Sequence, residues 1–302
     1  MTAPQLSASP ALGPLLARGA LLSPFKRPRP GAAFSGGRLV LPGLRVDLAG
    51  LAAYERVCGF PTGDDALPIT YPHVLGFPLA MRIMSGRAFP LPLLGLVHTS
   101  ISLTRHRPLP ATGTTYELAV HVDRLVPHRR GTEAVVVTEL REDGTGGEGG
   151  EGGKVVWESE STYLARHRTG GQVPDAARSP APGSGEPPLP VAGPPLPVVG
   201  EWRLAADVGR RYGAVSGDRN PIHLSPLTAR LFGFPRAIAH GMWTAARCIA
   251  AHGTPAAAHV AVDFRAPVLL PGTVAYAAKG GRFELRGTGG DGERVHVRGR
   301  VG

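Results

Sequence analysis

The sequence predicts an α+β protein that contains two copies of one domain. Residues 38–168 show helical spacing followed by strands of period two, and residues 201–302 repeat this order. A Pro-rich segment separates the two stretches. The pattern Y-x-x-V-x-G occurs in both, beginning at Tyr54 and at Tyr212, 158 residues apart. A short motif that recurs together with the same order of elements indicates a duplicated domain.

The first 36 residues are rich in Pro, Gly, Ala and Ser and have no sustained periodicity, so we expect a flexible N-terminal arm over residues 1–36. The first domain is predicted over residues 37–168. It begins with a short strand, continues with helices over residues 48–58 and 77–84 that are separated by an extended proline-containing path, and ends with strands. Four strands are predicted, at residues 99–103, 115–122, 134–140 and 155–163. A glycine-rich hairpin loop is predicted at residues 143–153.

The clearest domain boundary is the segment 169–200, where the frequent prolines are typical of a semi-rigid, extended linker. The second domain is predicted over residues 201–302. Its predicted helices lie at residues 204–215, 227–232 and 241–251. Its predicted strands lie at residues 259–264, 274–279, 282–286 and 294–301.

The chain is strongly basic, with a net charge of +10 and a pI near 10.4. This charge favours a polyanionic partner such as an acidic carrier protein, an acidic membrane surface or nucleic acid, although a high arginine content alone also produces it. The basic runs are short and lack interleaved aromatic residues for base stacking, so we expect no nucleic-acid partner.

The two cysteines, Cys58 and Cys248, both have apolar neighbours, which argues against a disulfide framework. No cluster of His and Cys residues has metal-ligand spacing, so we expect neither a metal nor a cofactor. No apolar run reaches membrane-spanning length, and the N-terminus does not resemble a secretory signal. A cytoplasmic location is therefore expected.

The candidate site lies between Tyr212 and Trp243. Asp218 and His223 are five residues apart on a proline-containing turn, where a carboxylate and an imidazole can transfer protons. Gly241 follows His240 at the start of the third predicted helix, and a backbone N–H at a helix N-terminus can stabilise an oxyanion. We therefore predict that Asp218 and His223 are catalytic and that Gly241 binds the substrate oxygen.

Each of these residues also has a structural alternative. Asp218 can cap the turn that follows it, and His223 can be a buried structural histidine. Asn220 is expected to form an Asx turn, and His240 to mark the helix entry with its side chain away from the reaction. Ser225 is expected to cap a short helix. In the first domain, His73 and His98 are taken as structural or tunnel-lining residues.

The repeat places Phe60 opposite Asp218 and Asp65 near His223. The first domain therefore keeps the scaffold but lacks the acid–histidine pair. This contrast favours a chemical role for Asp218 and His223 and indicates that the first domain helps to shape the substrate tunnel.

The run Y-G-A-V-S-G-D-R-N-P-I-H followed by A-H-G-M resembles the signature of MaoC-like dehydratases and R-specific enoyl-thioester hydratases. The later V-D-F-R-A-P-V stretch is also similar to that family. In the first domain, Y-P-H-V-L followed by F-P-L resembles the actinobacterial double hot-dog 3-hydroxyacyl-thioester dehydratases. The resemblance covers residues 38–168 and 200–302, and neither the arm nor the linker has a counterpart.

This resemblance implies a double hot-dog fold, in which two antiparallel sheets each wrap a central helix and form a pseudo-dimer. It implies the reversible removal of water from (3R)-3-hydroxyacyl thioesters of CoA or acyl-carrier protein in fatty-acid metabolism. Asp218 and His223 would be catalytic, Gly241 would supply the oxyanion amide and Asn220 would order the site. A non-catalytic acyl-thioester-binding subunit and a hot-dog thioesterase are the alternatives. The chain would act as a monomeric pseudo-dimer or as a homodimer.

Overall fold

A computed structural model describes residues 3–28, 32, 34, 36–142, 153–169, 195–289 and 294–302. The chain forms two compact units. Unit 1 contains Met1–Val46, Pro72–Ile101 and Thr112–Pro188, and unit 2 contains Asp47–Tyr71, Ser102–Ala111 and Leu189–Gly302. Most of the predicted glycine-rich loop and of the predicted linker lies outside the described residues. The predicted domain boundaries remain a prediction.

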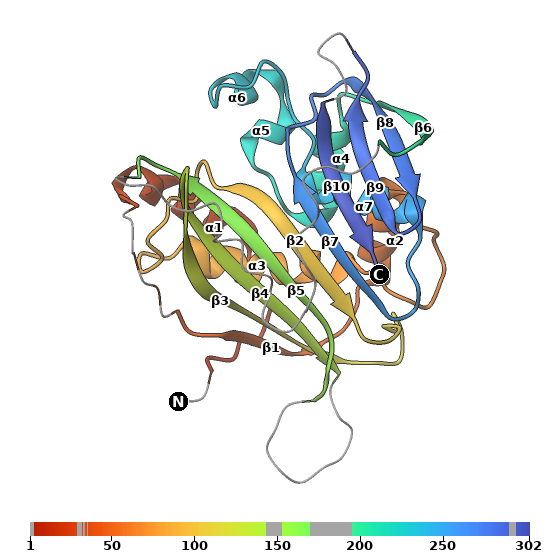
Figure 1. Ribbon diagram of the computed structural model, residues 1–302. Helices are drawn as coiled ribbons and strands as arrows, with labels where there is room; N and C mark the ends of the chain where they lie inside the picture. Colours follow the sequence, from red (N-terminus) through yellow and green to blue (C-terminus); the bar gives the residue numbers. More distant parts are fainter. Residues whose placement is uncertain are drawn as a thin grey trace. The chain divides into compact units, whose positions relative to one another are not determined.

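Unit 1 is an antiparallel sheet with helices. Its strands are β1 (Leu39–Leu44), β3 (Tyr116–His128), β4 (Gly131–Glu142), β5 (Val155–Arg166) and most of β2 (Val97–Arg105), in the order β1-β3-β4-β5-β2 (Figure 1). Helix α3 (Tyr71–Met84) packs closely on the sheet at Gly76, where a Cβ would lie 2.7 Å from the methyl group of Thr138. Alternating buried side chains on β3, β4 and β5 form the core beneath this helix.

Unit 2 contains five antiparallel strands. Its strands are β6 (Val198–Leu204), β7 (Ala258–Phe264), β8 (Gly272–Lys279), β9 (Arg282–Gly287) and β10 (Val295–Val301), in the order β6-β8-β9-β10-β7. Helix α7 (Gly241–His252) packs on β9 and β10. Before it come α4 (Val208–Ser216), α5 (Pro221–Leu224) and α6 (Pro226–Arg230). None of the helices in the described ranges is both long and apolar enough to cross a membrane.

The strand orders of the two units agree with the internal repeat. With β1 matched to β6 and β2 to β7, the order β1-β3-β4-β5-β2 in unit 1 equals β6-β8-β9-β10-β7 in unit 2. The matched helices α2 (Leu48–Cys58) and α4 end in the same way, at Gly59 with φ 80° and at Gly217 with φ 75°. Glycine adopts this left-handed conformation without a Cβ penalty, which explains its place at the end of both copies of the motif.

Helix α2 belongs to the first repeat in sequence but to unit 2 in space. The ring of Tyr54 lies 6.2 Å from that of Tyr212 on α4, and the Trp243 indole of α7 donates a hydrogen bond of 2.9 Å to the carbonyl of Val57. The guanidinium group of Arg105 joins further parts of unit 2, since it donates to the carbonyls of Leu67, Pro255 and Ala256. Unit 2 is therefore assembled from both repeats.

Several elements differ from the sequence prediction. Helix α3 begins at Tyr71, six residues before the predicted start, because Pro72 occupies the first turn, where no N–H is needed, and Pro78 is accommodated inside the helix. Strand β6 begins at Val198, inside the predicted linker, and extends to Leu204, the first residue of the predicted helix; α4 begins only at Val208.

The N-terminal arm contains a helix that the sequence does not predict, α1 (Leu12–Leu22), followed by a short 3₁₀ turn at Ser23–Phe25. Arg18 on α1 donates hydrogen bonds to the carbonyl of Arg82 and to the hydroxyl of Ser85, at the C-terminal end of α3. These contacts with the rest of unit 1 stabilise a helix whose own sequence pattern is weak.

Candidate active site

The loop that follows α4 is ordered by its own polar groups. After the left-handed Gly217, the Ser216 hydroxyl accepts a hydrogen bond from the amide of Asp218 (3.2 Å). The Asp218 carboxylate accepts one from the amide of Asn220 (3.1 Å), and the Asn220 side chain caps α5 by accepting from Ile222 (3.4 Å). Asp218 thus stabilises the turn, as its structural alternative requires, and Asn220 forms the expected cap.

Two glycines of α4, Gly209 and Gly213, lie beneath this loop. A Cβ on Gly209 would lie 2.0 Å from the carbonyl oxygen of His223, and a Cβ on Gly213 would lie 2.8 Å from that of Asp218. Both glycines are therefore required for the loop to lie directly on the helix. At the repeat offset of 158 residues, the first repeat has Leu51 and Glu55 in their places.

His223 is buried on α5, with 8% of its surface exposed. Its Nδ1 lies 2.8 Å from the carbonyl oxygen of Ile238. Because a carbonyl can only accept, Nδ1 carries the proton and Nε2 of the neutral ring keeps a free lone pair. Burial lowers the pKa of His223, although the nearby Asp218 charge and the hydrogen bond to Ile238 oppose this shift. His223 is thus neutral near pH 7 and able to accept a proton at Nε2.

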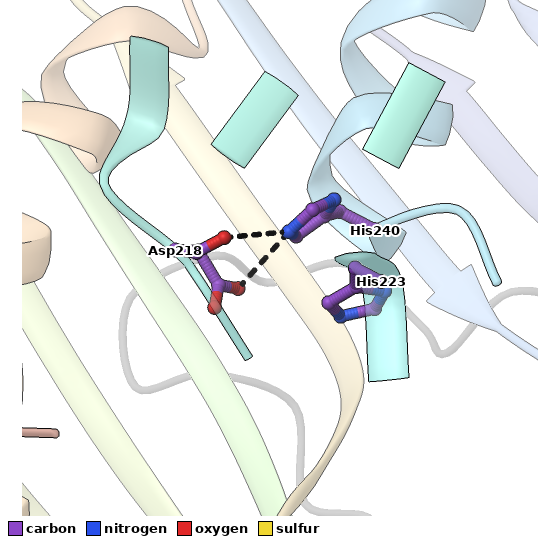
Figure 2. A group of neighbouring side chains, drawn as sticks. All are labelled: Asp218, His223 and His240. Atoms are coloured by element: carbon purple, nitrogen blue, oxygen red, sulfur yellow. Dashed lines mark hydrogen bonds and ion pairs between the residues drawn. The ribbon is translucent and has the colours of Figure 1, made fainter. Parts of the chain in front are cut away.

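His240 is the N-cap residue of α7, as predicted, but its side chain contacts both members of the pair (Figure 2). Its Nε2 lies 2.9 Å from the carbonyl oxygen of Asp218 and 3.8 Å from the carboxylate of the same residue. Its ring stacks on that of His223, with centroids 3.7 Å apart and planes at 27°. Burial, and then the neighbouring His223, lower the pKa of His240 to about 4.

The sequence interpretation missed this arrangement. The contact between His240 and Asp218 joins residues 22 apart in the chain and depends on how α7 meets the α4–α5 loop. The only local signal was the position of His240 directly before the candidate oxyanion residue, Gly241.

Asp218, His223 and His240 also form a set of potential metal ligands, with one donor atom from each within 4.8 Å of the others. Zn²⁺ binds imidazole nitrogen at about 2.0–2.1 Å, along lone pairs that lie in the ring plane. The two imidazoles are stacked 3.7 Å apart, so their lone pairs lie in two separate, nearly parallel planes and are poorly placed to meet at one ion. The arrangement suits proton transfer better than chelation of a single ion.

Gly241 is the first residue of α7, where a backbone N–H has no acceptor within the helix. A Cβ on Gly241 would lie 3.2 Å from the ring of Phe264 at the end of β7. A larger side chain would therefore fill space beside this N–H. Ser225 accepts a hydrogen bond from the amide of Thr228 (3.1 Å), which confirms its predicted role as the cap of α6.

The two histidines of the first repeat form a separate group in unit 1. The rings of His73 and His98 stack with centroids 5.9 Å apart, and that of His98 stacks on Tyr163 at 4.5 Å. Burial lowers the pKa of His98 well below its usual value. These features fit the structural role expected from the sequence.

Unit 2 therefore combines antiparallel strands, a helix packed on them, and a part-exposed carboxylate beside a buried imidazole, close to the first turn of that helix. This arrangement is a candidate acid–base site on a hot-dog scaffold.

The comparisons with known proteins agree with this class. Residues 187–291 match the family described as "MaoC like domain". The chain is 38% identical over 242 residues to 3-hydroxyacyl-thioester dehydratase X of Mycobacterium tuberculosis, covering 78% of each protein. It is 32% identical over 216 residues to 3-hydroxyacyl-thioester dehydratase Y of the same organism, covering 67% of this chain and 69% of the relative.

Solved structures agree as well. The crystal structure of HtdX from Mycobacterium tuberculosis matches with a TM-score of 0.69 and 32% identity, covering 87% of this chain and 98% of that one. A conserved hypothetical protein of the same organism, described as a double hot-dog fold, matches with a TM-score of 0.52 and 14% identity over 90% of this chain and 94% of its own, which supports the fold alone. The chain belongs to the MaoC-like family of double hot-dog 3-hydroxyacyl-thioester dehydratases.

Proposed function

We propose that this protein is a hydro-lyase that removes water from (3R)-3-hydroxyacyl thioesters to give trans-2-enoyl thioesters, and that it also catalyses the reverse hydration in fatty-acid metabolism. The observation that carries this proposal is the buried His223 beside Asp218, with one imidazole nitrogen held by Ile238 and the other free. The family membership of the chain supports the same reaction.

In the dehydration direction, Nε2 of His223 accepts a proton from C2 of the thioester. A proton passes from the Asp218–His223 pair to the 3-hydroxyl group, which leaves as water while the C2–C3 double bond forms. One proton enters the pair and one leaves it, so the enzyme returns to its starting state. The Asp218 carboxylate stabilises the positive charge on the imidazole, consistent with its raising effect on the pKa of His223.

The thioester oxygen gains negative charge when C2 loses its proton. The N–H of Gly241, at the positive end of the α7 dipole, is the proposed donor to this oxygen. Asn220 is proposed to order the site through its cap on α5 rather than to take part in the chemistry.

The proposed substrate carrier is CoA or acyl-carrier protein, both of which are anionic. Between residues 208 and 262 the chain has one acidic residue, Asp218, and six arginines: Arg210, Arg211, Arg219, Arg230, Arg236 and Arg247. Exposed apolar side chains lie among them on α6 and the turn after it, at Leu227, Leu231 and Phe232. Three of these arginines precede the helix that carries His223 and three follow it, and we propose that they attract the carrier. We propose no nucleic-acid partner.

The alternatives are less well supported. A non-catalytic acyl-thioester-binding subunit has no need of the adjacent Asp218 and buried His223 that this chain has. A hot-dog thioesterase ordinarily requires a carboxylate on the central helix, and Gly241–His252 contains none.

We also propose a cytoplasmic location, since both cysteines are buried and unpaired. The oligomeric state proposed is a monomer, in which the two repeats act as a pseudo-dimer, or a homodimer. Light scattering coupled to size-exclusion chromatography distinguishes these two states.

The decisive experiment is hydration of enoyl-CoA thioesters of four to about sixteen carbons by the wild type, Asp218→Asn and His223→Ala. Losing a general acid–base group should lower kcat by about 10²–10⁴-fold. Asp207→Asn and His252→Ala are matched controls in unit 2, on either side of the site in the chain, and should keep kcat. Near-normal activity in folded Asp218→Asn and His223→Ala would refute the assignment.

A further inference from the structure

His240 makes more contacts in the site than its position as the N-cap residue of α7 requires. It is 2% exposed and makes no side-chain cap hydrogen bond to α7. Its Nε2 bonds instead to the carbonyl of Asp218, one face of its ring covers His223, and the ring of Tyr212 lies 4.9 Å away. A single side chain thus joins α7, α4, the Asp218 loop and α5.

The hydrogen bond fixes the tautomer of His240. The carbonyl of Asp218 can only accept, so Nε2 carries the proton and Nδ1 is unprotonated. Nδ1 is buried and has no hydrogen-bond partner among the described residues. The ring is therefore neutral, which agrees with the strong lowering of its pKa by burial. A neutral ring can stack at 3.7 Å on His223 without charge repulsion when His223 takes up a proton.

The bond from His240 also restrains the backbone of Asp218. Gly213 provides room for the Asp218 carbonyl without bonding to it. A carbonyl that loses a buried donor gains a desolvation cost and shifts toward another partner. Any such shift moves the carboxylate of Asp218 relative to the imidazole of His223, which is held independently by Ile238.

We propose that His240 is a positioning residue, which holds Asp218 in place through its Nε2–H and supports the ring of His223 by stacking. The proposal rests on the proposed catalytic roles of Asp218 and His223. It assigns His240 no contact with the substrate.

Two neutral amides of different length test the hydrogen bond. In His240→Gln, the side-chain nitrogen lies near the position of Nε2 and can donate to Asp218. In His240→Asn, the nitrogen corresponds to Nδ1 and falls short. We expect His240→Asn to lower kcat for enoyl-CoA hydration by about 10- to 100-fold, with KM changed by less than about threefold, and His240→Gln to stay within about fivefold of the wild type.

His240→Phe tests the stacking separately, since it keeps a flat ring but has no donor. We expect its kcat to fall by about as much as that of His240→Asn. Circular dichroism and thermal midpoints establish folding for each variant, and the Gln and Asn pair decides the question if the Phe variant does not fold. Wild-type kcat in folded His240→Asn, or equal losses in the Gln and Asn variants, would overturn the proposal.

A readout that does not depend on activity separates this inference from the proposed function. The amide of Asn220 is bonded to the Asp218 carboxylate, so its hydrogen exchange reports the placement of Asp218. Exchange at Asn220 should be faster in His240→Asn than in His240→Gln. If the wild type lacked hydratase activity, the proposed function would fail, while this exchange difference would still test the positioning role. Equal exchange in both variants would contradict it.

Discussion

Helices α2 and α4 are matched copies that pack against each other in unit 2, yet only α4 is followed by the proposed proton-transfer pair. Both end at a left-handed glycine. After α4 the chain lies on Gly209 and Gly213 and presents Asp218 and His223. After α2 the corresponding positions serve packing. The ring of Phe60 stacks on Tyr54 at 6.3 Å, and the carboxylate of Asp65 accepts a hydrogen bond from the amide of Ala111.

The difference shows that the motif Y-x-x-V-x-G specifies a helix end, while the residues around its fixed positions decide how the next loop packs. With Leu51 and Glu55 in the helix, the backbone of the next loop cannot approach as it does at Gly209 and Gly213. The proposed site of this chain therefore combines two features that the first repeat lacks, the Asp218 and His223 side chains on the loop and two glycines on the helix beneath it.

The strongest test of this comparison is Gly209→Ala. The new methyl group would lie 2.0 Å from a backbone oxygen of His223, so α5 must move away from α4. We expect a loss of about 1–3 kcal/mol in the free energy of unfolding and a fall in kcat of at least about 100-fold. Gly200→Ala is the matched control, because a Cβ there meets nothing within 4 Å. Equal effects of the two substitutions would break the comparison.

The buried histidines predict a pH dependence that the first repeat's loop, with Phe60 and Asp65, should not share. The pKa of His240 is lowered from 6.5 to about 4, so the unfolded chain binds its proton first as the pH falls. Its contribution to stability is complete above pH 6.5 and is lost between pH 6.5 and about 4, by up to about 3 kcal/mol. Urea unfolding over this range measures the loss, and His240→Gln should make the dependence shallower. An unchanged slope in that variant would contradict the assignment.

Gly213→Ala is a milder version of the first test. Its Cβ would lie 2.8 Å from the carbonyl of Asp218, a contact that a small shift of the loop can relieve. We expect kcat to fall about tenfold, with a change in stability of about 1 kcal/mol. The ratio of the two losses in kcat shows which residue is more sensitive to displacement of the loop. A greater fall in Gly213→Ala than in Gly209→Ala would mean that this residue is Asp218 rather than His223.

The smallest expected effect concerns the contact between α2 and α7. Trp243→Phe removes the donor to the Val57 carbonyl while keeping an aromatic ring. We expect a loss of about 1 kcal/mol in the free energy of unfolding, and kcat within about threefold of the wild type. Differential scanning calorimetry measures the first quantity. A large loss of kcat would show that α2 has a direct part in arranging the site.

Much of the fold was readable from local patterns. Helix α2 was predicted at its observed bounds because helical spacing meets a glycine stop, and the strands were predicted because period-two alternation marks a sheet with one buried face. The start of α3 was not predicted correctly, because a proline is compatible with both an extended path and a first helical turn. Strand β6 was not predicted. It is stabilised by pairing with β8, and the proline-rich sequence around it does not favour a strand.

For the site, the sequence identified Asp218 and His223 because they lie on one short turn. It did not reveal the contacts of His240 or of Gly209. These contacts join the loop to α7 and to the start of α4, and no pattern along a single segment encodes them. The candidate reactive groups were thus visible from spacing, while the side chains and backbone that contact them became visible only in three dimensions.

The composition of unit 2 also has a consequence for how the protein is made. Asp47–Tyr71 and Ser102–Ala111 leave the ribosome well before α4, α7 and strands β6 to β10 exist, and unit 2 cannot close until those later elements arrive. The contact of Trp243 with Val57 can form only at that stage. The catalytic unit is therefore completed late in synthesis, and a fragment limited to the second repeat would begin folding with one of its helices missing.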